Sequence, residues 1–251
     1  MSALFDYIVH QHGDRQWGHV LDAGTGVTSM RWLRHLPATR LTAVTASGAM
    51  AKRVRKAGGA LPDQARLVVG NWNDETLLAG EQFDVVLADY FVGAIEAFSA
   101  YQQDRLLHRL ARLCRDRFYL VGLEPYVLYK PSDEAGALVW RIGRLRDALL
   151  LLAGQQPYRE YPEGWTRRHL EQAGLRILDV RRFPIRYRAR FIDGQLDMCD
   201  DRLPLIRDAA LREALANQVR ALREEAHEAE QRLGGLRHGF DYVITAESTV
   251  R

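Results

Sequence analysis

An acidic residue followed by a Gly-x-Gly turn is the pattern in this chain best suited to chemistry. It lies in the stretch Val20-Leu21-Asp22-Ala23-Gly24-Thr25-Gly26. Glycine has no Cβ, so a turn built from it lets backbone N–H groups come close to a ligand. The apolar residues before Asp22 predict a strand that ends at this carboxylate. The stretch therefore predicts a pocket for a nucleotide-sized ligand.

Other polar residues follow apolar, strand-like runs in the same way. They are Thr45, Asn71, Asp89 and Glu124. In doubly wound sheets, ligands bind outside the carboxyl ends of the parallel strands. We therefore expect these side chains and Asp22 to line one edge of a sheet.

The elements that would position these residues alternate between strand and helix. Residues 27–36 have the apolar spacing of a helix, with Thr28 or Ser29 as its cap and Pro37 as its stop. A second helix is predicted over 47–57, and further strands over 41–44, 66–69, 83–88 and 118–123. Five such alternations predict a mostly parallel, doubly wound sheet of the α/β class.

The second half of the chain departs from a minimal sheet. It predicts helices over 134–153 and 164–173, a strand over 175–180, a charged helix or helix pair over 204–233 and a last strand over 240–246. We predict one domain over residues 1–251, with insertions at about 126–164 and 191–237. A helix-mediated homodimer through 204–233 is compatible with this pattern.

Four segments together resemble the class I S-adenosylmethionine-dependent methyltransferases. They are Val20 to Gly26, Ala43-Val44-Thr45-Ala46-Ser47, Val69-Gly70-Asn71-Trp72 and Phe83 to Tyr90. The resemblance covers roughly residues 17–125 and has a weaker echo at the C-terminus. It implies the Rossmann-like methyltransferase fold, a seven-stranded, mostly parallel sheet whose last strand is antiparallel. It also implies S-adenosylmethionine as cofactor and S-adenosylhomocysteine as product.

The resemblance also assigns cofactor-binding residues. In that family the Gly-rich turn holds the methionine part, the second strand end the ribose and the third strand end the adenine. Carried over by position, the cofactor-binding residues are Asp22, Ala23, Gly24, Thr25, Gly26, Thr45, Ala46, Asn71, Trp72 and Asp89. Thr45 stands where the family usually has an acidic residue, and a hydroxyl makes a weaker hydrogen bond than a carboxylate. Asn71 stands where an aspartate is common.

The implied reaction is an in-line displacement, in which a nucleophile attacks the methyl group of the cofactor and no metal is needed. A nitrogen or oxygen acceptor also calls for a base. Asp89 and Glu124 are the carboxylates at neighbouring strand ends, and Asp89-Tyr90 resembles the substrate-facing motif of the family. We therefore expect Glu124, Asp89 and Tyr90 to be catalytic. Structural alternatives are that Asp89 caps the next helix and that Glu124 fixes a turn before Pro125.

Candidate substrate-binding residues lie mostly in the second half of the chain. The run Arg186-Tyr187-Arg188-Ala189-Arg190-Phe191 alternates, which predicts three arginines on one face of a strand. They could hold a carboxylate or phosphate, or they could form a solvated face paired to Asp193, Asp197, Asp200 or Asp201. Aromatic rings suit a sulfonium cofactor, although core packing is the alternative. The substrate-binding residues expected are Tyr126, Tyr158, Tyr161, Arg186, Arg188 and His238.

Composition narrows the class of protein and its partners. The net charge of +3 is mild and acidic residues are nearly as numerous as basic ones, so nucleic acid and membrane surfaces are not expected partners. The N-terminus lacks a signal-peptide core, and two cysteines without metal or disulfide spacing favour a cytosolic, that is cytoplasmic, protein with no metal. A compact core with a long insertion favours a small-molecule acceptor, and the arginines favour an anionic one.

Two other classes stay open at this point. An aminopropyltransferase-like enzyme would use a related fold, but it needs acidic residues for a polyamine, and the run Ala88-Asp89-Tyr90-Phe91 offers one. A catalytically silent nucleoside-binding module is the other class, because Thr45 and Asn71 replace acids expected in the family. Cofactor affinity distinguishes a working enzyme from a silent module.

Overall fold

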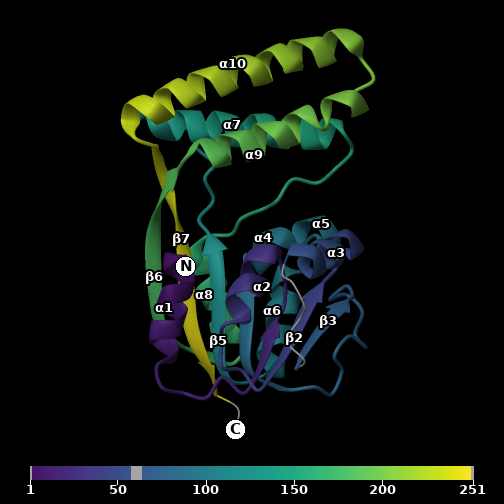
Figure 1. The fold of residues 1–251 in the computed structure, drawn as a ribbon, viewed down its shortest axis with the longest axis vertical. Coiled ribbons are helices and arrows are strands. Elements are labelled where there is room, and N and C mark those ends of the chain that lie inside the picture. Colours follow the sequence, from purple (N-terminus) through teal and green to yellow (C-terminus); the bar gives the residue numbers. More distant parts are fainter. Residues whose placement is uncertain (1, 58–63, 250–251) are drawn as a thin grey trace. The chain divides into compact units, whose positions relative to one another are not determined.

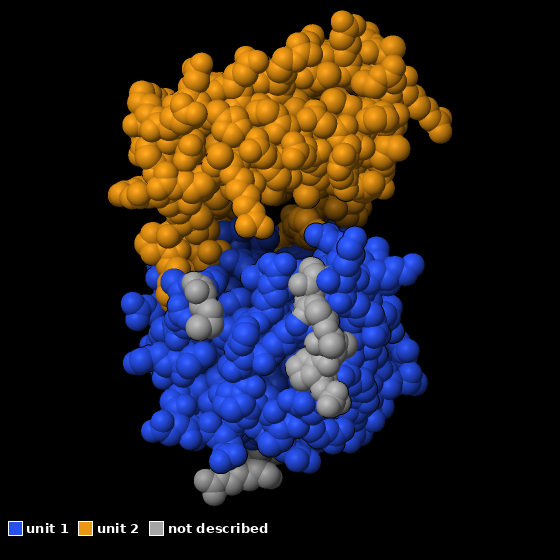
Figure 2. Space-filling model, viewed as in Figure 1, with its two compact units in different colours: residues 1–123, 160–182, 242–251 blue, residues 124–159, 183–241 orange. Residues whose placement is uncertain are grey.

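A computed structural model describes residues 2–57 and 64–249 of the chain. The chain forms two compact units, which are coloured separately in Figure 2. The first unit contains residues 1–123, 160–182 and 242–251, and the second contains residues 124–159 and 183–241. Most residues of the insertions expected at about 126–164 and 191–237 belong to the second unit. The single domain over 1–251 stays a prediction.

A seven-stranded sheet with the order β3-β2-β1-β4-β5-β7-β6 organises the fold (Figure 1). Its strands are β1 (His19–Asp22), β2 (Arg40–Thr45), β3 (Ala65–Val69), β4 (Phe83–Asp89), β5 (Cys114–Leu123), β6 (Leu175–Tyr187) and β7 (Leu236–Ser248). Neighbouring strands from β3 to β5 pair in parallel. The arrow of β7 points opposite to that of β5 (Figure 1). The doubly wound, seven-stranded, mostly parallel sheet is therefore confirmed.

The first unit surrounds its part of the sheet with helices. They are α1 (Ala3–His12), α2 (Val27–Leu33), α3 (Gly48–Ala57), α4 (Phe91–Ala94), α5 (Glu96–Ser99), α6 (Gln103–Leu113) and α8 (Glu163–Gln172). Helix α2 packs against α3, and α6 packs against α8. Strands β1 and β4 read as continuous apolar runs because such central strands are covered on both faces. Leu21 and Val86, for example, are fully buried.

The second unit contains three long helices that pack against one another. They are α7 (Glu134–Leu152), α9 (Ala189–Asp200) and α10 (Ala209–Leu233), with the short 3-10 helix η1 (Leu203–Leu205) before α10. Asp133 caps α7 by accepting a hydrogen bond from the N–H of Gly136 at 2.8 Å. Asp208 caps α10 in the same way, and Gly234, with a φ of 66°, ends it.

The expected strand through residue 191 is wrong. Strand β6 ends at Tyr187 and helix α9 begins at Ala189, so Arg190 lies on a helix. Helical spacing decides this segment, because the buried residues of α9 recur at helical intervals. These residues are Ile192, Leu196 and Cys199.

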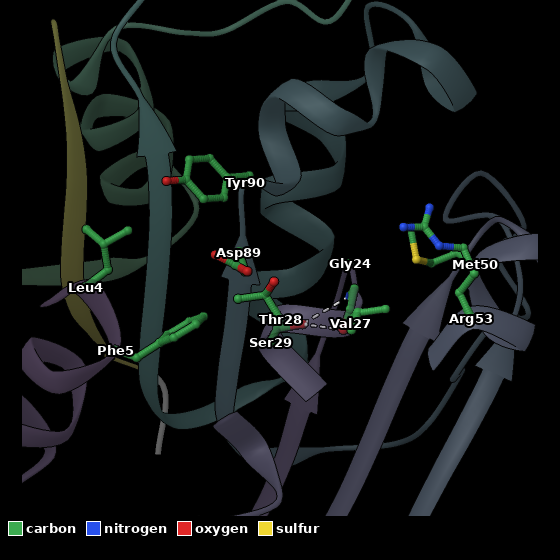
Figure 3. Close-up of a pocket in the computed structure, with 11 residues that line it drawn as sticks. Leu4, Phe5, Gly24, Val27, Thr28, Ser29, Met50, Arg53, Asp89 and Tyr90 are labelled. Carbon is green, nitrogen blue, oxygen red and sulfur yellow. Dashed lines mark hydrogen bonds between the residues drawn. The ribbon is translucent and has the colours of Figure 1, made fainter. Parts of the chain in front are cut away.

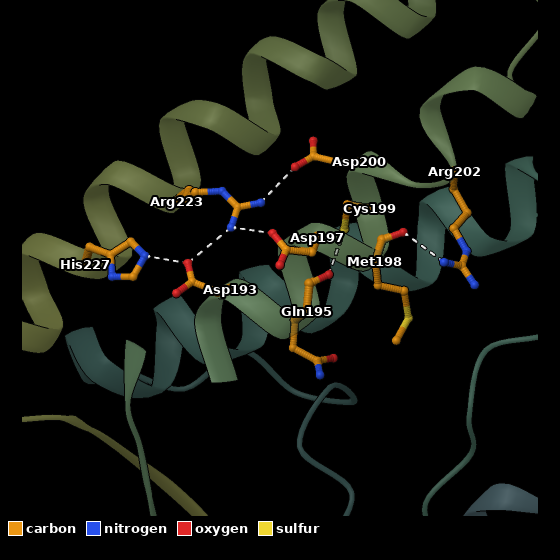
Figure 4. Close-up of polar contacts among 9 residues, drawn as sticks. All are labelled: Asp193, Gln195, Asp197, Met198, Cys199, Asp200, Arg202, Arg223 and His227. Atoms are coloured by element: carbon orange, nitrogen blue, oxygen red, sulfur yellow. Dashed lines mark hydrogen bonds and ion pairs between the residues drawn. The ribbon is translucent and has the colours of Figure 1, made fainter. Parts of the chain in front are cut away.

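The aspartates of α9 pair with α10, not with the arginines of the 186–190 run (Figure 4). The guanidinium of Arg223 lies 3.2 Å from Asp193, 3.0 Å from Asp197 and 2.8 Å from Asp200. His227 lies one turn further along α10 and contacts Asp193 at 2.8 Å. These charges therefore join two helices of the second unit.

No helix in the described ranges combines the length and the apolar character that a membrane span requires.

Candidate functional site

A pocket of about 410 Å³ lies in the first unit, beside the carboxyl ends of β1 and β4 (Figure 3). Its volume is within the range typical of small-molecule sites. It is lined by Leu4, Phe5, Gly24, Gly26, Val27, Thr28, Ser29, Met50, Arg53, Asp89 and Tyr90. The Gly-rich turn and the Asp89-Tyr90 pair, which the sequence places at different strand ends, therefore share one cavity.

Asp22 supports the turn from below. Its side chain is fully buried, and its Oδ2 accepts a hydrogen bond of 2.8 Å from the Ser29 hydroxyl. Ser29 Oγ in turn accepts from the N–H of Gly26 at 3.1 Å. Burial raises the pKa of the Asp22 carboxyl from 3.8 to about 6. Oδ1 has no hydrogen-bond partner among the described residues.

The cap of α2 differs from the prediction. Gly26 is the N-cap residue, and Ser29 acts from the third position of the helix. Thr28 lines the pocket instead of capping the helix. The difference follows from the bridge that Ser29 forms between Asp22 and the turn, because this bridge satisfies the N–H of Gly26 and makes Gly26 the cap, two residues before Thr28.

The pocket contains open space in front of the backbone of Gly26, which we call the cradle. The Gly26 φ of −124° is ordinary extended backbone, so the glycine is not needed for conformation. A Cβ built at this position would meet no heavy atom within 4 Å. The empty space in front of the backbone, together with the buried oxygen of Asp22, fits the polar end of a nucleoside cofactor that binds against a Gly-rich turn.

Asp89 and Tyr90 form the second wall at the end of β4. Both side chains are partly buried, and the N–H of Tyr90 donates to the carbonyl of Val121 at 3.0 Å. Tyr90 has a φ of 46° and a ψ of 26°, a left-handed conformation that is unfavourable for a side chain of this size. Such strain concentrates at functional sites, where the surrounding structure holds it in place. Tyr90 precedes α4 as its N-cap residue.

Sequence reasoning missed four lining residues from α1 and α3. In Figure 3, Leu4 and Phe5 lie on one side of the pocket, and Met50 and Arg53 lie on the other. Phe5 is held in place by stacking on Trp32 at 4.5 Å. Met50 and Arg53 are three residues apart on a helix that follows β2, and that spacing is the signal that could have identified them.

The other expected cofactor residues lie outside the lining of this pocket. Thr45 is buried, and its hydroxyl accepts from the N–H of Ser47 at 3.3 Å. Asn71 is exposed, and its Oδ1 accepts from the N–H of Asn73 at 2.9 Å and from Ser99 Oγ at 3.0 Å. These side chains therefore stabilise the loops at the ends of β2 and β3. Their role toward a cofactor stays a prediction, as does that of Ala46.

Trp72 lies beneath the Gly-rich turn. It is buried, and its indole N–H donates to the carbonyl of Ala23 at 2.7 Å. The guanidinium of Arg109, a residue of α6, lies 5.3 Å from the centre of the Trp72 ring. Trp72 thus braces the turn, and its binding role stays a prediction.

Most expected substrate-binding residues belong to the second unit. Tyr126 is buried there and its hydroxyl accepts from Arg146 at 2.8 Å, whereas Tyr158 is exposed. Arg188 forms an ion pair with Glu230 at 3.2 Å. Glu124, expected to be catalytic, follows β5 and also belongs to this unit.

Tyr161 is the exception and belongs to the first unit. Its ring lies 4.3 Å from that of Trp165, and its carbonyl accepts from the Tyr242 hydroxyl at 2.9 Å. Arg186 and His238 line a separate pocket of the second unit. The structure therefore brings together Gly24, Gly26, Asp89 and Tyr90, and it describes the remaining candidates elsewhere.

Comparison with known protein families gives one match. Residues 20–117 match the family model described as a methyltransferase domain. No curated protein sequence matches the chain.

Many solved structures share the fold. A candidate methyltransferase from Bacillus halodurans C-125 is 15% identical with a TM-score of 0.61, over 98% of this chain and 99% of that one. A cyclopropane-fatty-acyl-phospholipid synthase-like protein from Lactobacillus casei ATCC 334 is 13% identical with a TM-score of 0.62, over 98% and 89%. Magnesium protoporphyrin IX methyltransferase from Synechocystis PCC 6803, solved with bound S-adenosylhomocysteine, is 12% identical with a TM-score of 0.54, over 98% and 81%. At these identities the likeness concerns the fold.

Proposed function

We propose that this chain, whose residues 20–117 match the family model of a methyltransferase domain, transfers a methyl group from S-adenosylmethionine to a small, anionic acceptor by in-line displacement. The observation that carries the proposal is the shared pocket of the Gly-rich turn and the Asp89-Tyr90 pair. The aminopropyltransferase alternative has no such support from the family model, which describes methyl transfer.

Different residues of the pocket are proposed to contact different parts of the cofactor. We assign the turn from Asp22 to Gly26 to the methionine part of the cofactor, where backbone N–H groups and the open cradle at Gly26 are available. Met50 and Arg53 would hold the far end of the cofactor from α3. Leu4 and Phe5 would exclude water from the pocket. When bound, the cofactor supplies an electrophilic methyl group on a sulfonium centre.

Two carboxylates are the candidates for taking a proton from the acceptor. Asp89 lines the pocket and is partly buried, beside the strained Tyr90. Glu124 follows β5 at the next strand end. We propose that Asp89 and Tyr90 orient the acceptor and that Glu124 serves as base or orienting group. Positioning alone can supply about 7–11 kcal/mol of the barrier in favourable cases.

Cofactor binding is the first test, and Gly26→Ala is its sharpest variant. The added methyl group meets no protein atom within 4 Å, so the fold should tolerate it, yet it occupies the cradle. Gly48→Ala is the matched control, because its Cβ also meets nothing within 4 Å and Gly48 does not line the pocket. We expect calorimetry to give micromolar binding of S-adenosylmethionine and S-adenosylhomocysteine, about tenfold weaker in Gly26→Ala and unchanged in Gly48→Ala.

If Gly26→Ala and Gly48→Ala bind the cofactor with equal affinity, the assignment of the Gly-rich turn to the methionine part of the cofactor is rejected. Absence of binding by the wild-type protein would favour the silent nucleoside-binding module.

Turnover is tested with Glu124→Gln and small carboxylated or phosphorylated acceptors, followed through release of S-adenosylhomocysteine. We expect slower turnover with intact cofactor binding, and an unchanged rate would remove Glu124 from the mechanism.

The association state and location are separate proposals. Helix α10, which forms most of the 204–233 segment expected to mediate a homodimer, packs against α7 and α9 of its own chain. Solution scattering that shows a monomer at high concentration would discard the homodimer. The proposed cytoplasmic location is tested by fractionating cells that produce the protein.

A further inference from the structure

A second pocket of about 450 Å³ lies within the second unit, between the end of β6 and the start of β7. It is lined by Asp133, Pro184, Ile185, Arg186, Arg237, His238 and Gly239. Two guanidinium groups and one imidazole therefore border a cavity of ligand size. None of these side chains belongs to the pocket at the Gly-rich turn.

Arg186 and Arg237 differ from the neighbouring arginines because neither forms an ion pair within the described ranges 2–57 and 64–249. Arg176 pairs with Glu247, Arg182 pairs with Glu163, and Arg188 pairs with Glu230. Charged groups along these strands are thus usually neutralised by a carboxylate of the protein. Both arginines of the pocket are exposed, so their charges face solvent and are accessible to an anion.

The position of Arg186 is set by the backbone. Gly235 has a φ of 112°, and a Cβ there would lie 2.6 Å from Cγ of Arg186. The aliphatic part of Arg186 therefore packs directly on a glycine that lacks a side chain. Long side chains held in this way lose less conformational entropy when they bind a ligand.

The lining also contains one carboxylate, that of Asp133. Asp133 accepts a hydrogen bond from the N–H of Gly136 at 2.8 Å, as the cap of α7. Its negative charge therefore satisfies the first turn of a helix. His238 completes the lining, and its Nε2 is buried with no partner among the described residues.

We propose that Arg186, Arg237 and His238 form an oxyanion-binding site that receives a phosphate or carboxylate group of a small molecule. Guanidinium groups present paired N–H donors whose geometry matches both kinds of group. The site lies within the second unit, and its test is a direct measurement of anion binding that does not require turnover.

The test is calorimetric titration of the full chain with inorganic phosphate and, separately, with succinate at constant ionic strength. We expect Arg186→Gln and Arg237→Gln each to weaken binding about tenfold, because each removes a charge-assisted hydrogen bond. Arg190→Gln is the matched control, because it removes the same charge from an exposed residue of α9 that lies outside the pocket lining. The affinity of this variant for either probe should stay within about twofold of the wild type.

Binding of either probe that is weakened in both pocket variants and retained in Arg190→Gln supports the site and identifies its preferred group. Absence of binding by both probes overturns it. Equal weakening by Arg190→Gln also overturns it, because the attraction would then reflect net charge. Circular dichroism and thermal unfolding of each variant show whether the fold is retained, and a double variant that keeps both the fold and full affinity would overturn the proposal as well.

Discussion

The buried carboxyl of Asp22 predicts that stability and function oppose each other at the Gly-rich turn. Its side chain is fully buried, and burial raises the pKa from 3.8 to about 6. The fold therefore favours the protonated form. Asp22 contributes its stability fully below pH 3.8 and loses this contribution as the pH rises through about 6.

The magnitude follows from the two pKa values. The difference between 3.8 and about 6 corresponds to about 3 kcal/mol, at about 1.36 kcal/mol for each pH unit. Asp22→Asn cannot ionise, and its amide oxygen can still accept from Ser29. We expect the variant to become more stable than the wild type as pH rises, with the difference growing by about 2 kcal/mol between pH 4.5 and 8.

The assay is urea unfolding followed by tryptophan fluorescence. Four of the five tryptophans belong to the first unit, which also contains Asp22. Asp14→Asn is the control, since it makes the same substitution at an exposed position of the first unit. A difference that is the same at pH 4.5 and pH 8 for Asp22→Asn would refute the reasoning. If Asp22→Asn is more stable but binds the cofactor more weakly, the loss of stability caused by burying the Asp22 carboxyl serves function.

Three further substitutions test other parts of the structure. Tyr90→Asn should relieve left-handed strain by about 1 kcal/mol but lower turnover, whereas Tyr101→Asn, at a φ of 63° outside the pocket, should relieve similar strain in thermal unfolding without changing turnover. Trp72→Phe should cost about 1–2 kcal/mol in urea unfolding and weaken cofactor binding in calorimetry, because the buried carbonyl of Ala23 loses its donor. Arg223→Gln should lower stability by about 1 kcal/mol at low salt and less at high salt, because it loses three partly exposed ion pairs.

Local patterns were sufficient to predict the strands that carry the candidate site. Strands β1 and β4 lie in the middle of the sheet, and their continuous apolar runs end at Asp22 and Asp89. Each of these acids therefore marks a strand end in the sequence itself. Because parallel strands end at one edge, the meeting of the Gly-rich turn and Asp89 in one pocket could also be predicted.

Tertiary contacts decided what the sequence left open. Phe5 lines the pocket through packing of α1 on Trp32, and no spacing in the sequence links these residues. Trp72 was expected at the cofactor, but its N–H bonds to the carbonyl of Ala23, a partner 49 positions away. The alternation at 186–191 predicts a strand, but β6 ends at Tyr187 and a helix begins at Ala189, in the middle of this run. Short windows do not contain these competing contacts.

Two residues near one pocket, Asp22 and Tyr90, each carry a local cost in stability. Asp22 lies buried below the turn with a raised pKa, and Tyr90 adopts a left-handed conformation at the end of β4. Asparagine at either position would relieve the cost, so stability alone gives no reason for either residue. The two features arise from different physics, burial of a charge and backbone strain. We therefore propose that a ligand bound in the cavity lined by Gly26 and Asp89 compensates for both costs.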